Sequence, residues 1–169
     1  MDRRAAIAIC AAPALVAGCG AGEVSTFPTF AAAMKAVESL AAGHKLVSTW
    51  SLAQMLEHAA QSVEYSMHGF PQPRSALFRH TVGSAAFAVF DARGRMSHAL
   101  DEPIPGAPAL AADAPLPAAI ERLLAALRAF EAHTGVLAPH FAYGALDKAQ
   151  YTRAHLMHLA NHWEQVQRA

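Results

Sequence analysis

The segment Tyr151-Thr-Arg-Ala-His-Leu-Met-His-Leu-Ala-Asn-His-Trp163 places three of the chain's ten histidines within eight residues, at His155, His158 and His162. Because a helix advances about 100° per residue, these side chains would project within about 60° of one another. Apolar residues recur beside them at helical spacing, at Leu156, Leu159, Ala160, Trp163 and Val166. The segment therefore predicts a helix whose imidazoles border a buried face.

The start of this helix is also marked in the sequence. Asp147 and Gln150 have the spacing of a capping box, and Leu146 and Tyr151 that of a hydrophobic staple. Imidazoles in an apolar seam are costly unless their nitrogens find partners, and a divalent metal is a partner that serves several at once. The alternative is that they hydrogen-bond to neighbouring helices or lie at the edge of the seam.

A second helix is predicted from Ser51 to about residue 68. Ser51 and Gln54 form another capping-box pattern, with Trp50 and Met55 as the staple pair. His58 lies about 120° from the centre of the apolar face of this helix. It faces the interior only if the helix is covered on two sides.

The remaining pattern predicts three further helices and one long connection. Apolar spacing favours helices from about Pro28 to Gly43, from Leu77 to Phe90, and from Pro117 to about Gly135. Residues 93–117 are rich in proline and glycine, which leaves little room for regular structure. No pair of strands is expected. The predicted fold is all-α, a four-helix bundle with an extra helix and a long connection between the second and third bundle helices.

Residues 1–22 have the pattern of an export signal. Arg3-Arg4 precedes an apolar run, and Val16-Ala-Gly-Cys19 resembles the cleavage site of a bacterial lipoprotein. The alternative, a transmembrane anchor, needs about 20 apolar residues, and this run is shorter and contains a proline. We expect a protein of the periplasm, or one attached to a membrane only through lipid on Cys19.

Composition limits the partners and the metal ligands. Lysine plus arginine equals aspartate plus glutamate at 13 each, so no basic field exists to hold nucleic acid. Both cysteines, Cys10 and Cys19, lie in the signal segment, so a metal site in the domain would depend on histidine, carboxylate and water. The expected partners are a small-molecule substrate and, for assembly, a second copy in a homodimer.

One histidine from the second helix and an i, i+4 pair from the last would give three imidazoles on two facing helices. Side chains at i and i+4 lie about 6 Å apart along one face, so both can reach a single ion. Three neutral nitrogens suit zinc, nickel, iron or copper better than magnesium or calcium. We expect zinc or nickel, with iron as an alternative, and an open coordination position.

Four segments together resemble a known family: Trp50–His58, Met67–Pro71, His140–Leu146 and Ala154–His162. The resemblance is to a branch of unknown function in the DinB/YfiT-like superfamily of metalloenzymes, and it covers about residues 27–166. Members of that superfamily are four-helix bundles with a divalent metal held by a histidine on the second helix and an HxxxH pair on the last. By matching position, the resemblance implies His58, His158 and His162 as the ligands.

Two functions follow as hypotheses. The first is a metal-dependent hydrolase or transferase acting on a small molecule, with His155 as the proton acceptor and with His140 and Tyr143 at the pocket mouth. No HExxH glutamate lies between His158 and His162, so a protease-like mechanism is unsupported. The resembled superfamily includes transferases that use small intracellular thiols. An exported protein would seldom meet these thiols, so hydrolysis suits it better than thiol transfer. The alternative is a non-catalytic metal-binding or ligand-binding module of the cell envelope. Four scattered histidines receive no role: His44, His80, His98 and His133.

Overall fold

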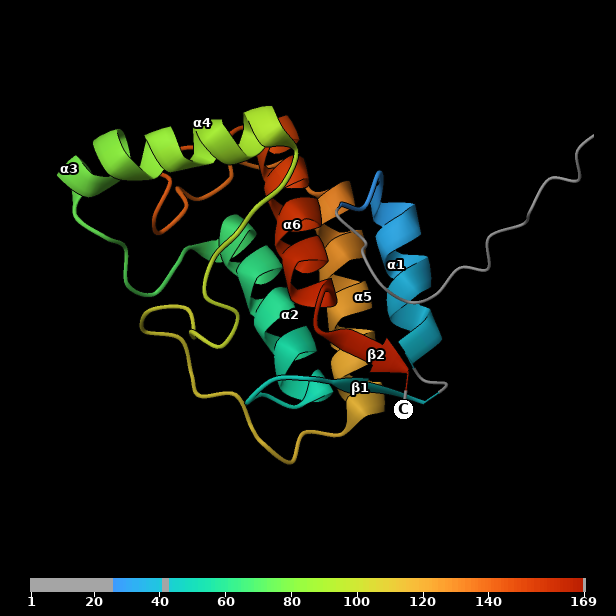
Figure 1. The fold of residues 1–169 in the computed structure, drawn as a ribbon. Helices are drawn as coiled ribbons and strands as arrows, with labels where there is room; N and C mark the ends of the chain where they lie inside the picture. The colour runs from blue at the N-terminus through green and yellow to red at the C-terminus, as the bar shows by residue number, and fades with distance from the viewer. Residues whose placement is uncertain (1–25, 41–42, 169) are drawn as a thin grey trace, which may run out of the picture.

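The computed structural model describes residues 26–40 and 43–168. Within this part the chain is mostly helical and carries one small sheet (Figure 1). The helices are α1 (Phe30–Ser39), α2 (Leu52–His68), α3 (Ala76–Phe78), α4 (Ser84–Arg93), α5 (Leu116–Ala132) and α6 (Lys148–Trp163), with a π-helical turn, η2 (Arg79–Gly83), between α3 and α4. The predicted signal segment, residues 1–22, lies outside the described residues.

Helices α1, α2, α5 and α6 share one hydrophobic core. Figure 1 shows them side by side, with α4 lying across one end. Phe30 of α1, Leu56 of α2, Leu127 of α5 and Leu159 of α6 are all buried in this core. A smaller cluster formed by Phe87, Met96, Ala154 and Met157 packs α4 against α6.

Local sequence signals set the ends of the two site-bearing helices. Both predicted capping boxes are present: the Ser51 hydroxyl accepts from the Gln54 backbone N–H, and the Asp147 carboxylate accepts from that of Gln150. In each box the glutamine side chain accepts in return from the backbone N–H of the capping residue. Each box pairs donors that the first helical turn leaves without partners, so α2 and α6 begin where the sequence predicts.

The sheet was not expected, and the all-helical prediction is wrong in this detail. Strands β1 (His44–Leu46) and β2 (Val166–Arg168) pair antiparallel, with Leu46 opposite Val166. Val166 was predicted to continue the stripe of the last helix, but α6 ends at Trp163. The first helix is also shorter than predicted, ending at Ser39 rather than near Gly43.

The segment from Leu77 to Phe90 is helical as predicted, but several of the apolar residues in it are not buried. Leu77, Val82 and Val89 are exposed, while Phe87 is buried. The connection between α4 and α5 has no regular structure, as predicted, and runs along α2 (Figure 1).

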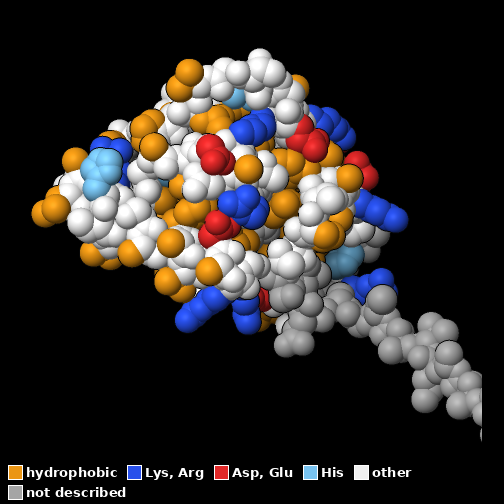
Figure 2. All heavy atoms as spheres, turned by 90° about the horizontal axis from the view of Figure 1, so that it is seen from above, with side chains coloured by type: hydrophobic (Ala, Val, Ile, Leu, Met, Phe, Trp, Pro, Cys, Tyr) orange, Lys and Arg blue, Asp and Glu red, His pale blue; other side chains and the backbone are white. Residues whose placement is uncertain are grey.

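Charges of both signs are interspersed with apolar side chains on the end of the molecule that α4 covers (Figure 2). No helix among the described residues is long and apolar enough to cross a membrane.

Candidate metal centre

Three imidazoles from α2 and α6 converge inside the molecule. His58 Nε2 lies 3.2 Å from His158 Nε2, and His162 Nε2 lies 3.1 Å from the same atom. One donor atom from each residue falls within 4.8 Å of the other two. We call His58, His158 and His162 the histidine triad. The structure therefore brings together the three residues that the resemblance implied.

His58 of α2 and His162 of α6 face the interior because each helix is covered on more than one side. His58 is 4% exposed and His162 is fully buried. The indole of Trp50 covers the triad, with ring centroids 5.1 Å from His58 and 6.3 Å from His162. The angular offset of His58 from the apolar face of α2 thus directs it toward α6 and not toward solvent.

The three Nε2 atoms cannot satisfy one another. Each imidazole nitrogen has a single in-plane site, which holds either a hydrogen or a lone pair. One hydrogen on His158 Nε2 or on a neighbour can therefore serve one close contact and not both. A cation that accepts three lone pairs satisfies all three, and tetrahedral zinc with bonds of about 2.05 Å places its nitrogens about 3.3 Å apart. The donor set fits a divalent transition metal.

The electrostatics keep the imidazoles neutral. Burial, together with a smaller effect of neighbouring histidines, lowers the pKa of His58 to about 4 and that of His162 to about 2. Burial also lowers the pKa of His158 well below its usual value. Neutral imidazoles have the free lone pairs that metal ligation needs.

Two of the triad histidines lack a hydrogen-bond partner for their second ring nitrogen. The Nδ1 atoms of His58 and His162 are buried and have no partner among the residues that the structure describes. Liganding histidines usually donate this second nitrogen to a carboxylate, carbonyl or water. Asn161, which could have filled this role, instead accepts a hydrogen bond from the backbone N–H of His98.

His155 lies one turn below the triad and is held in one tautomer. The Ser66 hydroxyl donates to the Val63 carbonyl at 2.6 Å, so its oxygen accepts from His155 Nε2–H at 3.1 Å. Nδ1 of His155 then carries the lone pair. Burial lowers the pKa of His155 to about 3, which makes the ring a weak base.

A cavity of about 210 Å³ adjoins the triad. His58, His155 and His158 reach it from α2 and α6, and His140 and Tyr143 also line it. His140 Nδ1 accepts from the backbone N–H groups of Ala142 and Tyr143, both at 3.1 Å, and its ring stacks on Tyr143. Most of the other lining residues are apolar or aromatic, so the cavity suits a small molecule with an apolar body.

His98, to which the sequence assigned nothing, also lies at the triad. Its ring centroid is 4.9 Å from that of His158 and 5.2 Å from that of His162. The residue belongs to the connection between α4 and α5, where no helical period relates it to the histidine triad. The sequence shows an isolated histidine here, but no pattern in it indicates that the fold brings this residue to the triad.

The fold and the site together define a helical protein with a histidine triad beside a small cavity. A family model described as "Protein of unknown function (DUF1569)" matches residues 23–169, and the chain belongs to that family. No curated protein and no solved structure matches the chain.

Proposed function

We propose that this chain is a DinB-like four-helix bundle, over about residues 27–166, that holds a divalent transition metal through His58, His158 and His162. The observation that carries the proposal is the convergence of three Nε2 atoms, with both close contacts, 3.1 and 3.2 Å, meeting at His158. Zinc and nickel are the metals that the three neutral nitrogens suit best, with iron as the alternative.

The function that this centre supports best is that of a metal-dependent hydrolase or transferase acting on a small molecule. When bound, the ion would act as a Lewis acid toward a substrate oxygen at the cavity. The neutral His155 would offer Nδ1 to a donor group of the substrate and so orient it or take its proton. Apolar and aromatic residues of the cavity would exclude water from the reacting groups.

One observation favours a second function, that of a non-catalytic binding module. A pKa of about 3 leaves His155 a poor proton acceptor near neutral pH, and the triad itself contains no carboxylate. In this case the same cavity would hold a ligand against the ion without turnover.

Steady-state kinetics on a panel of small esters, amides and epoxides separates the two functions. The enzyme hypothesis predicts turnover by metal-loaded wild type and its loss in His158→Ala, whereas His80→Ala, an exposed change away from the triad, stays active. If a ligand stabilises wild type and neither wild type nor His158→Ala shows turnover, only the binding module remains.

We further propose that residues 1–22 direct export and that Cys19 carries lipid, which would place the domain in the periplasm. Labelling of expressed protein with a radioactive fatty acid tests this, because Cys19→Ser would remove the label.

A further inference from the structure

The ring of His98 packs on the triad at the spacing that the triad itself has. Its distances from His158 and His162 are 4.9 and 5.2 Å between ring centroids. Within the triad the corresponding distances run from 4.8 to 5.1 Å. A fourth imidazole is thus part of the same cluster.

The hydrogen bonding of His98 fixes which nitrogen is free. Nδ1 lies 2.7 Å from the carbonyl oxygen of Ala99. A carbonyl only accepts, so Nδ1 carries the hydrogen and Nε2 carries the lone pair. Nε2 is buried and has no partner among the described residues. The cluster therefore contains a buried nitrogen lone pair with no hydrogen-bond partner among the described residues. Buried polar groups in proteins rarely lack a partner.

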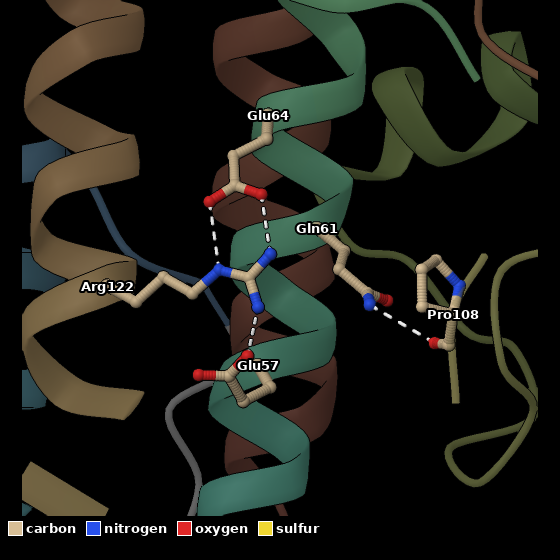
Figure 3. Close-up of polar contacts among 5 residues, drawn as sticks. All are labelled: Glu57, Gln61, Glu64, Pro108 and Arg122. Atoms are coloured by element: carbon tan, nitrogen blue, oxygen red, sulfur yellow. Dashed lines mark hydrogen bonds and ion pairs between the residues drawn. The ribbon is translucent and has the colours of Figure 1, made fainter. Parts of the chain in front are cut away.

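The segment that carries His98 is tied to both ligand-bearing helices. The backbone N–H of His98 donates to Asn161 Oδ1 at 3.2 Å, and Asn161 directly precedes the triad residue His162. Farther along the connection, the Gln61 side chain of α2 donates to the Pro108 carbonyl at 3.3 Å (Figure 3). These two bonds hold the backbone of the connection beside α2 and α6, and so keep the side chain of His98 near the triad.

We propose that His98 donates Nε2 as a fourth imidazole ligand to the ion held by the histidine triad. The inference rests on the proposed metal function. His98 is not among the donor atoms that lie within 4.8 Å of one another, so its side chain moves toward the ion on loading. A residue on a connection can make that movement more readily than one fixed in a helix.

This assignment has a consequence for the chemistry. Zinc in structural sites is tetrahedral, and four imidazoles would complete its coordination. A substrate would then have to displace one ligand or add as a fifth. His98 is the ligand best placed to leave, because it is the one outside α2 and α6.

Titration with Co²⁺ tests the assignment with the intact chain, using wild type, His98→Ala and His80→Ala. We expect His98→Ala to bind Co²⁺ at least about tenfold more weakly, since even partners behind the ligands are worth that much. His80 is exposed, and its variant should bind like wild type. X-ray absorption of the wild-type complex should count four imidazoles, a measurement that needs no substitution.

The outcomes separate this inference from the proposed function. Equal Co²⁺ affinity in wild type and His98→Ala, together with three imidazoles in the wild-type complex, overturns the role of His98 and leaves the triad intact. If wild type binds no Co²⁺, both proposals fall.

Discussion

His58 and His158 are 100 residues apart in the chain, and their Nε2 atoms lie 3.2 Å apart in the fold. Two neutral imidazoles can share one hydrogen at that distance, but His162 presents a third nitrogen to the same atom of His158. With all three rings neutral, one of these two close contacts therefore has no hydrogen of its own to bridge it.

Stability of the metal-free protein should fall as the pH falls below about 6.5. Burial lowers the pKa of His140 and of His155 to about 3, so below pH 6.5 the unfolded chain binds protons that the folded chain does not. Each such histidine costs up to about 1.4 kcal/mol per pH unit, so these two would cost roughly 4 kcal/mol between pH 7 and pH 5. Urea unfolding at both pH values measures the difference. An equal free energy of unfolding would show that these rings are protonated in the folded state.

Ser66→Ala should destabilise the protein and disturb His155. The change removes the acceptor of His155 Nε2–H and leaves a buried donor unsatisfied, which costs about 1–3 kcal/mol. Ser62→Ala is the matched control, since Ser62 is buried on the same helix and no side-chain hydrogen bond is found for it among the described residues. Thermal unfolding compares the two variants, and equal melting temperatures would count against the hydrogen bond.

Gly83→Ala should displace the loop that walls the cavity. A Cβ at this position would lie 1.8 Å from the carbonyl oxygen of Ala142, so the π-helical turn or the loop must move. Overpacking of this kind costs about 1–3 kcal/mol. Ser84→Ala changes the exposed neighbouring residue and should be nearly neutral. If urea unfolding finds Gly83→Ala as stable as Ser84→Ala, the close approach is not rigid.

Arg122 of α5 joins two glutamates of α2 and so holds the helix that carries His58 (Figure 3). The two carboxylates, above all that of Glu64, raise the pKa of the guanidinium. Because the Arg122 side chain is 37% exposed, we expect Arg122→Leu to cost only about 1 kcal/mol, and less in high salt. Arg128→Leu, which breaks a more exposed pair with Glu38, is the control. Urea unfolding at two salt concentrations measures both, and equal losses would argue against the network.

The sequence allowed prediction of the features that depend on neighbours in the chain. The capping boxes at Ser51 and Asp147 and the apolar period fix α2 and α6 locally, and the i, i+4 spacing of His158 and His162 follows from α6 itself. The pairing of these two with His58 came from the resemblance, because angular position alone left His58 either buried or exposed.

Other features depend on tertiary contacts that no local pattern encodes. Strands β1 and β2 have three residues each, and their pairing is set by where the ends of α1 and α6 lie. His98 reaches the triad because Asn161 holds its backbone, a contact between residues 63 positions apart. The spacing of His98 in the sequence carries no trace of that contact.

Metal content is the most direct test of the histidine triad. Separate samples of protein purified without a histidine tag are dialysed against zinc, nickel or iron, and then against metal-free buffer. The metal that each sample retains is measured by elemental analysis. We predict about one ion per chain in wild type and a loss of that ion in His158→Ala, whose side chain meets both other ligands. Wild type that retains no metal, or His158→Ala that retains as much as wild type, would contradict the account.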